Sequence, residues 1–186
     1  MERGIHERRK ILTLPPYLGE DLERQYGKIE YKGKRVLDVG AEYGSTASFF
    51  LGKGAKEVIA VEGSIKYQRL LRRNAKTLGS IIAITEWITK PDDFANLIKK
   101  YKPDVVKVDC EGCEVHLFNI PDGVFSLVSE YVVETHSDRL FKDMLNKCDR
   151  TNYEVWTTLP IKDQVNVVYA RKTPPHIILR KFHLNS

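Results

Sequence analysis

Apolar and polar positions alternate along the chain in a way that predicts a parallel sheet with helices between its strands. Short runs rich in valine and isoleucine are separated by stretches in which apolar residues recur at helical spacing. This order favours an α/β fold with a mainly parallel sheet. The expected parallel strands are residues 35–39, 57–61, 80–84, 104–108 and 131–134.

The helices are predicted from the spacing of apolar residues and from their end signals. Ser137 is a suitable N-cap for a helix after the fifth strand, and Gly79 is suited to end the long helix after the second. Pro121, Asp122 and Gly123 predict a turn. Shorter helices are expected at 18–26, 45–51 and 92–101, and the buried face of the long helix is expected to carry Ile65, Leu70, Leu71, Ala75 and Leu78.

The last two apolar runs, 153–158 and 164–170, are separated by only a few residues. Because a parallel crossover needs a longer connection, these runs should form an antiparallel hairpin. A dinucleotide-binding dehydrogenase domain would normally continue in parallel. We therefore expect one α/β domain over residues 31–172, with a helical lead-in at 1–30 and a basic tail at 173–186.

Composition fits one globular domain. The 186 residues are 42% hydrophobic and 30% charged, and no apolar run approaches the length of a membrane span. The charged start of the chain is followed by no apolar secretory core, so we expect a soluble cytoplasmic protein with no membrane partner. Three cysteines, Cys110, Cys113 and Cys148, form an odd set, and reduced thiols are expected.

The net charge of +5 is concentrated in three segments, residues 1–10, 66–73 and 171–183. Such segments could meet an anionic partner such as RNA. Charged runs also commonly line solvated helix faces and chain ends, so charge does not decide between these readings.

Glycines and acids follow the first two strands, where α/β sheets bind their ligands. Gly40 and Gly44 allow a sharp turn and a close approach of the backbone to a ligand, and Glu62 is placed to accept hydrogen bonds from a ribose diol. The Gly-x-x-x-Gly spacing and the carboxylate of Glu42 disfavour a diphosphate, whereas Asp38 and Glu42 would attract a sulfonium and an ammonium. The predicted cofactor is S-adenosylmethionine.

Further polar residues follow the third and fourth strands. Glu86 and Trp87 are candidates for the edge and the face of an adenine, and Asp109 and Glu111 follow the fourth strand. The predicted cofactor-binding residues are Asp38, Gly40, Ala41, Glu42, Tyr43, Gly44, Glu62, Gly63, Glu86, Trp87, Asp109 and Glu111.

Three segments resemble one enzyme family. VKVDCEGCE, ending at Glu114, resembles the K-[IV]-D-x-E-G-x-E signature of FkbM-type methyltransferases, and VLDVGAEYGSTA resembles that family's first motif. The run from Val133 to His136 resembles the family's E-[IV]-H. The resemblance extends in order from about residue 36 to 155. It implies a Rossmann-like class I methyltransferase fold and methyl transfer from S-adenosylmethionine to a hydroxyl oxygen of a small molecule or sugar.

Two of the motifs depart from the family. Glu42 stands where the family usually has asparagine, and Glu62, Gly63 and Ser64 stand where it has Glu-Pro-Asn. The stretch between the third and fourth strands is also short. We therefore expect altered cofactor contacts and a smaller or differently shaped acceptor pocket.

A hydroxyl acceptor needs a group that takes its proton. His136 is the first candidate for this general base, and Asp109 is the alternative. Asp109, Glu111, Glu134 and His136 could instead surround a divalent ion, although no metal is expected. The pair Cys110 and Cys113 lacks the partners of a zinc site.

Two other functions remain open from the sequence. The chain could act on or bind RNA through its basic termini, with Tyr153, Trp156 and Tyr169 as stacking surfaces. It could also be a relative that binds a nucleoside without catalysis, because fold does not fix function.

Overall fold

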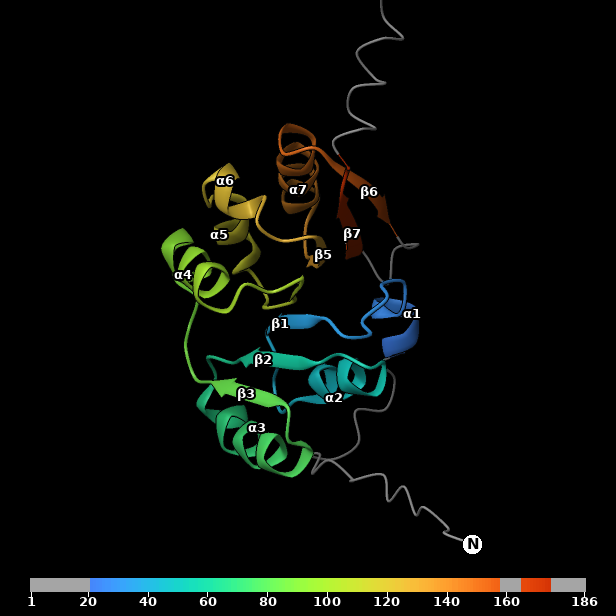
Figure 1. The fold of residues 1–186 in the computed structure, drawn as a ribbon. Helices are drawn as coiled ribbons and strands as arrows, with labels where there is room; N and C mark the ends of the chain where they lie inside the picture. The colour runs from blue at the N-terminus through green and yellow to red at the C-terminus, as the bar shows by residue number, and fades with distance from the viewer. Residues whose placement is uncertain (1–20, 158–164, 175–186) are drawn as a thin grey trace, which may run out of the picture.

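The computed structural model describes residues 21–157 and 165–174, and its centre is one seven-stranded sheet (Figure 1). The strand order is β3-β2-β1-β4-β5-β7-β6. The strands are β1 (Arg35–Val39), β2 (Glu57–Val61), β3 (Ile81–Ile84), β4 (Val105–Val108), β5 (Glu130–Thr135), β6 (Tyr153–Thr157) and β7 (Asn166–Lys172).

The sheet has the predicted mixture of strand directions. Strands β1 to β5 pair in parallel, whereas β7 pairs antiparallel with β5 and with β6. The last strand, β7, therefore lies between β5 and β6. The α/β fold with a mostly parallel sheet and an antiparallel C-terminal hairpin is confirmed.

Helices cover both faces of the sheet (Figure 1). On one face are α1 (Leu22–Tyr26), α2 (Ser45–Gly52) and α3 (Ile65–Leu78), and on the other are α4 (Pro91–Tyr101), α5 (Glu114–Phe118), α6 (Asp122–Phe125) and α7 (Asp138–Arg150). Buried strand residues alternate between the two layers, since Val36 and Val58 pack with the first group while Leu37 and Ile59 pack with the second.

The chain crosses over at the centre of the sheet. From β1 it proceeds to β2 and β3 on one side, and it then returns to β4 on the other side of β1. Gly40 and Asp109 directly follow these two neighbouring strands, so the strand order reverses between them. This is where ligands bind in open α/β sheets.

The first described segment belongs to the same core as the sheet. Tyr26, Ile29 and Tyr31 are buried in the layer formed by α1, α2 and α3. Residues 18–20 of the predicted first helix lie outside the described residues, as do 1–17 and the tail from 175 onward.

Two local predictions need correction, and one helix was not expected. Ile65 is 85% exposed, because at about 3.6 residues per turn it points away from the helix face that buries Leu71 and Ala75. The predicted turn at Pro121–Gly123 instead begins α6, with Pro121 as its N-cap. Helix α5 was not predicted, since its five residues are too few for a helical period to be recognised.

Two end signals agree with the structure. Ser137 precedes α7, and its Oγ accepts a hydrogen bond from the backbone N–H of Leu140 at 3.2 Å. Gly79 follows α3, and its backbone N–H donates to the carbonyl of Ala75. None of the described helices combines the length and the apolar character needed to cross a membrane.

Candidate functional site

A cavity of about 480 Å³ opens at the carboxyl ends of the parallel strands. This volume is in the range of small-molecule sites. Three predicted cofactor residues, Asp38, Tyr43 and Gly44, do not line it. The predicted residues that line it are Gly40, Ala41, Glu42, Glu62, Gly63, Glu86, Trp87, Asp109 and Glu111.

The loop after β1 passes very close to the end of β4. A Cβ atom on Gly40 would lie 1.7 Å from the carbonyl oxygen of Asp109, and the φ of Gly40 is +78°. Both the contact and the backbone conformation therefore require glycine. The backbone N–H groups of Gly40 and Ala41 donate to the carbonyl of Val61, which joins this loop to the end of β2.

Asp38 supports the loop from beneath. It is fully buried, with Oδ1 3.1 Å from Nζ of Lys107 and with Oδ2 accepting a hydrogen bond from Oγ1 of Thr46 at 2.6 Å. Burial alone would lower the pKa of Lys107, but Asp38 and Asp109 raise it above its ordinary value, so the amine stays charged. Lys107 also donates to the carbonyl of Gly40 at 3.0 Å. Asp38 thus fixes the loop and does not face the cavity.

Lys107 was missed as a site residue by the sequence prediction. A lysine inside the apolar run of β4, which is buried at every position, was the available signal. Its burial requires an anion nearby, and Asp38 on the adjacent strand β1 lies directly opposite it.

Glu62 lies at the cavity wall after β2 and is 7% exposed. One carboxylate oxygen accepts a hydrogen bond from the N–H of Glu42 at 2.8 Å, and the other accepts from the N–H of Ser64 at 2.6 Å. These bonds orient the carboxylate and leave each oxygen able to accept another.

Trp87 lies against Gly63 at the edge of the cavity. A Cβ on Gly63 would be 2.4 Å from Cδ2 of the indole, so only glycine permits this contact. The indole is nonetheless 66% exposed. An exposed aromatic face therefore stands beside Glu86 at the cavity mouth.

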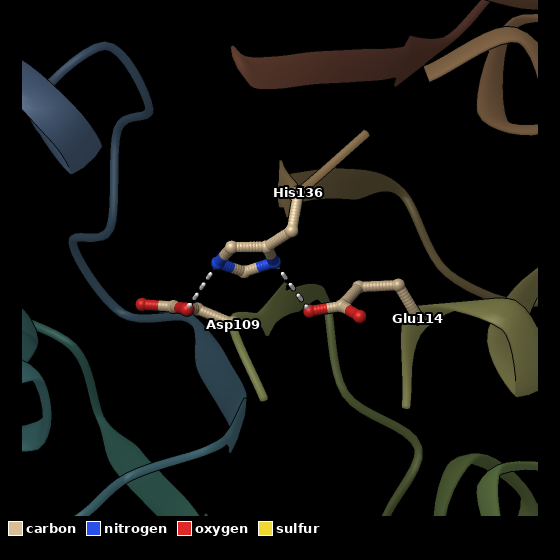
Figure 2. A group of neighbouring side chains, drawn as sticks. All are labelled: Asp109, Glu114 and His136. Atoms are coloured by element: carbon tan, nitrogen blue, oxygen red, sulfur yellow. Dashed lines mark ion pairs between the residues drawn. The ribbon is translucent and has the colours of Figure 1, made fainter. Parts of the chain in front are cut away.

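The imidazole of His136 lies between carboxylates (Figure 2). Its Nδ1 is 3.2 Å from Glu114, and its Nε2 is 3.7 Å from oxygens of Asp109, Glu111 and Glu134. These carboxylates, Glu114 foremost, raise the pKa of His136 to about 9 against the opposing effect of burial. The imidazole therefore carries a proton near neutral pH, and His136 is not among the residues lining the cavity.

Glu114 is fully buried and holds the turn after β4. Its two oxygens accept hydrogen bonds from the backbone N–H groups of Cys110 at 3.1 Å and Gly112 at 2.7 Å. Burial would raise the pKa of Glu114, but His136 and the backbone N–H of Cys110 lower it below the ordinary value. Glu114 is thus the anionic partner of His136.

Glu134 lines the cavity from the end of β5. Burial, together with the nearby charge of Asp109, raises the pKa of Glu134 to about 7. The hydroxyl of Tyr26 donates to Asp109 at 3.0 Å and lies 3.4 Å from Glu134, so it joins the two carboxylates. Neither Tyr26 nor Glu114 was among the predicted site residues.

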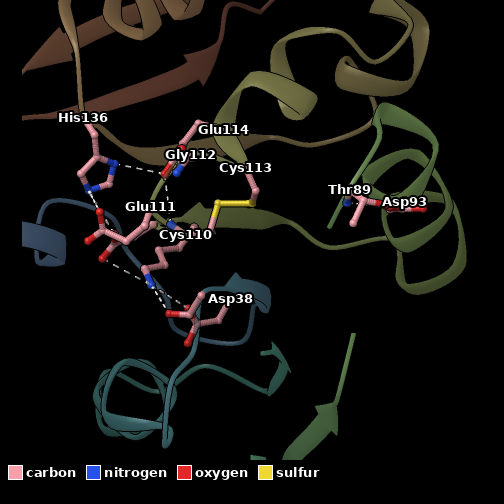
Figure 3. Close-up of a disulfide and its surroundings, with 12 residues drawn as sticks. Asp38, Thr89, Asp93, Cys110, Glu111, Gly112, Cys113, Glu114 and His136 are labelled. Carbon is pink, nitrogen blue, oxygen red and sulfur yellow. Dashed lines mark hydrogen bonds and ion pairs between the residues drawn. A yellow bond between two sulfur atoms is a disulfide. The ribbon is translucent and has the colours of Figure 1, made fainter. Parts of the chain in front are cut away.

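The prediction of reduced thiols is wrong for two of the cysteines. Cys110 and Cys113 form a disulfide in the cavity wall, beside Glu114 and His136 (Figure 3). The turn between them, with positive φ at Glu111 and Gly112, brings their Cα atoms to 5.5 Å, a distance that a disulfide can span. Cys148 is a buried free thiol.

The structure brings together only some of the residues that were predicted as an alternative metal site. Within the described residues, ligand atoms of Asp109, Glu114 and His136 lie within 4.8 Å of one another. However, Asp109 and Glu114 approach different nitrogens of the ring (Figure 2). This arrangement is that of an ion-paired imidazole, and the set Asp109, Glu111, Glu134 and His136 stays a prediction.

The aromatic residues suggested for RNA stacking serve the fold instead. Tyr153 and Tyr169 are buried, and Trp156 stacks on Tyr169 with ring centroids 5.6 Å apart. The basic segment 1–10 and most of 171–183 lie outside the described residues.

Two viral proteins of unassigned function are similar in sequence. Uncharacterized protein 158B of Sulfolobus islandicus rod-shaped virus 1 is 30% identical over 52% of this chain, and Uncharacterized protein 65 of a Sulfolobus islandicus filamentous virus is 34% identical over 50%. The matches span only 59% and 54% of the lengths of these relatives. A scan against models of known protein families finds no match, so membership of the FkbM family remains a prediction.

Solved structures that resemble this one include methyltransferases. A precorrin-6y C5,15-methyltransferase from Geobacter metallireducens has a TM-score of 0.60 at 15% identity and covers 82% of this chain and 85% of its own. Aeropyrum pernix fibrillarin with bound S-adenosylmethionine has a TM-score of 0.56 at 17% identity, covering 80% and 71%. Methanococcus jannaschii fibrillarin, a pre-rRNA processing protein, has a TM-score of 0.58 at 17% identity, covering 77% and 69%. The chain therefore has the Rossmann-like fold of these S-adenosylmethionine-dependent methyltransferases.

Proposed function

We propose that this protein is an S-adenosylmethionine-dependent methyltransferase that methylates a hydroxyl oxygen. The observation that carries the proposal is the cavity where the strand order reverses, with Gly40 and Glu62 in its wall. Nucleoside cofactors bind at this place in such sheets. A solved neighbour with the same fold holds S-adenosylmethionine.

The charge of the cavity fits this cofactor. Six acids line it, namely Glu42, Glu62, Glu86, Asp109, Glu111 and Glu134, whereas Lys107 and His116 are the basic residues among its lining. Lys107 is already engaged by Asp38. A wall of this charge attracts a sulfonium and an ammonium and repels a diphosphate. The fit therefore favours S-adenosylmethionine over NAD.

Each part of the cofactor has a suitable partner among these residues. Glu62 would accept hydrogen bonds from the ribose hydroxyls, since its carboxylate is held in place and retains acceptor capacity. Glu86 would meet the edge of the adenine. The indole of Trp87, for which a role at the adenine face was expected, is 66% exposed at the cavity mouth, and we do not assign it to the cofactor. Asp109 and Glu111 would meet the positively charged end.

When bound, the cofactor supplies a methyl group whose bond to sulfur breaks as its bond to the acceptor oxygen forms. The residues of the chain must then orient the acceptor and remove the proton of its hydroxyl. We assign that proton to the carboxylate of Glu134, which lines the cavity and has a pKa of about 7. Asp109 lies beside it, joined to it through Tyr26.

His136 takes a different role from the one predicted. Because its pKa is raised to about 9, its imidazole is protonated near neutral pH and cannot accept a proton. We propose that His136 is a positioning residue, whose positive charge holds Asp109, Glu111 and Glu134 close together. The acceptor, following the resemblance to FkbM-type enzymes, is a hydroxyl of a small molecule or sugar.

Isothermal titration calorimetry with Glu62→Ala tests the cofactor site. We expect the dissociation constant for S-adenosylmethionine to rise at least about tenfold, because hydrogen bonds to a buried carboxylate are lost. Glu57→Ala, at the opposite end of β2, is the control and should leave the affinity unchanged. Circular dichroism checks that both variants are folded, and equal affinities for the two would remove Glu62 from the cofactor site.

A further inference from the structure

Helix α3 has an unusually one-sided charge. Its fourteen residues include five lysines and arginines and no acid, and all five basic side chains are exposed. Lys66, Arg69, Arg73 and Lys76 are spaced so that they form one stripe along the helix, which we call the α3 stripe. With a rise of ~1.5 Å per residue, successive cations of the stripe are separated by about 4.5–6 Å along the axis.

The α3 stripe is not neutralised by the rest of the described chain. None of its four residues takes part in an ion pair among residues 21–157 and 165–174. Helix α7 provides a contrast, because three of its four cations are paired within the described residues. Arg139 meets Asp143, and Lys147 and Arg150 both meet Asp122.

The α3 stripe begins at the mouth of the cavity. Gly63 and Tyr67, which flank the first residues of α3, line the cavity. Two of the few exposed large apolar side chains are at the same place, Ile65 at 85% and Trp87 at 66% exposure. The indole of Trp87 lies against Gly63. A basic stripe and an open aromatic face therefore adjoin the entrance.

Cavity and stripe have opposite charge, and this difference restricts the acceptor. Acids line the cavity, so a phosphate is repelled from it, whereas an uncharged sugar is not. Phosphates would be attracted to the α3 stripe outside. A molecule that fits both regions would place an uncharged sugar in the cavity and its phosphates along the α3 stripe.

We propose that the α3 stripe and Trp87 bind single-stranded RNA and present a ribose hydroxyl to the cavity for methylation. This inference rests on the proposed methyltransferase function, and it replaces the small-molecule acceptor implied by the family resemblance with the ribose of an RNA chain. An unpaired base can stack on the exposed indole, as in many single-strand binding proteins. DNA offers the same phosphates and similar bases but lacks the 2′-hydroxyl that would accept the methyl group.

The reaction is balanced with the groups already described. The methyl carbon leaves the sulfonium, which becomes a neutral thioether, and forms a bond with the ribose oxygen. The proton of that hydroxyl passes to Glu134, which lines the same cavity.

An anionic membrane is the less suitable partner for this surface. Helices that lie in membranes expose an apolar face beside the basic one. In α3 the apolar residues Leu71 and Ala75 are buried against the sheet, and only Ile65 at its first turn is exposed.

Fluorescence anisotropy with a fluorescein-labelled single-stranded RNA of about 20 nucleotides tests the proposal. The double variant Arg69→Glu/Arg73→Glu should weaken binding at least tenfold and reduce its salt dependence. The matched control Lys99→Glu/Lys100→Glu changes the charge equally on α4, which covers the opposite face, and should change affinity less than about twofold. Equal losses in both variants, or no loss in the first, would overturn the proposed surface.

Three further measurements separate this inference from the proposed function. Trp87→Ala should weaken RNA binding several-fold while leaving its salt dependence unchanged. Calorimetry should show unchanged S-adenosylmethionine affinity for Arg69→Glu/Arg73→Glu, since these side chains do not line the cavity. Radiolabelled methyl groups should be transferred to the RNA and not to DNA of the same sequence.

Some outcomes would reject the RNA acceptor alone. If S-adenosylmethionine binds but no labelled methyl reaches the RNA, the acceptor is wrong while the cofactor site stands. If the stripe variant loses binding to phosphatidylserine vesicles and keeps its affinity for RNA, the surface is a membrane site and the proposal fails. If S-adenosylmethionine does not bind at all, the proposed function fails first.

Discussion

Acidic side chains have different surroundings at the two edges of the parallel sheet. At the amino edge, Glu130 is paired with both Lys34 and Arg171, and Glu57 is paired with Arg35. At the carboxyl edge, six acids line a cavity that has few basic residues. One of those basic residues, Lys107, is already held by Asp38 beneath the loop.

This difference separates structural acids from candidate functional ones. At the amino edge the acids form ion pairs with lysine and arginine side chains of the same chain, so we expect these pairs to stabilise the fold. At the carboxyl edge negative charge is concentrated around an opening, where burial and the charge of Asp109 raise the pKa of Glu134, and this concentration favours a cationic ligand. Substitutions at the carboxyl edge should therefore change activity, whereas those at the amino edge should change stability.

The largest expected effect comes from Glu134→Gln. If this carboxylate takes the acceptor's proton, the amide cannot, and kcat should fall about a hundredfold or more. Because the carboxylate must be deprotonated to act, kcat/KM of the unmodified protein should rise as the pH increases through about 7. The variant should lose this rise. Steady-state kinetics between pH 5 and 9 would measure both.

The control for that experiment is Glu57→Gln at the amino edge, where the side chain is distant from the cavity lining. It should keep both kcat and the pH profile. A Glu134→Gln variant with an unaltered profile would show that another group receives the proton.

A stability effect of intermediate size is expected from Glu130→Gln. The carboxylate is 4% exposed and binds Lys34 and Arg171, so its removal leaves two cations close together. Because both partners are partly exposed, we expect a loss of about 2 kcal/mol in the free energy of unfolding. Urea denaturation would measure it, with Glu57→Gln losing less than about 1 kcal/mol because Arg35 and Glu57 are more exposed. A Glu130→Gln variant as stable as the parent would contradict a structural role for this edge.

The smallest effect is expected from removal of divalent ions. The carboxyl edge contains a protonated imidazole among its acids, and this cation already provides the charge that a metal would bring. Methyl transfer should therefore proceed undiminished in metal-free buffer with a chelator. Activity that is lost there and restored by Mg²⁺ would establish the predicted metal set instead.

Much of the fold was predictable because the parallel strands other than the edge strand β3 are mostly buried on both faces. Their runs of valine and isoleucine can be recognised in the sequence. Strands β1 and β2 have the predicted limits, and β3 and β4 begin one residue later than predicted. The short helices α5 and α6 could not be predicted in this way, because four or five residues give no period. The placement of β7 between β5 and β6 depends on long-range pairing, which a local pattern does not contain.

The site was predictable where a residue follows a strand directly. Gly40, Glu62 and Asp109 were expected at one edge of the sheet, and all three line the cavity. Contacts between side chains were not predictable, since they depend on distances across the sheet. The pairing of Lys107 with Asp38 and the disulfide in the turn after β4 are examples.

The most direct test of the account is calorimetric titration of the full chain with S-adenosylmethionine and, separately, with NAD. Both ligands carry an adenosine, but only NAD brings a diphosphate to the acids of the cavity. We expect saturable binding of S-adenosylmethionine at one site per chain and no measurable binding of NAD. Binding of NAD in its place, or of neither ligand, would contradict it.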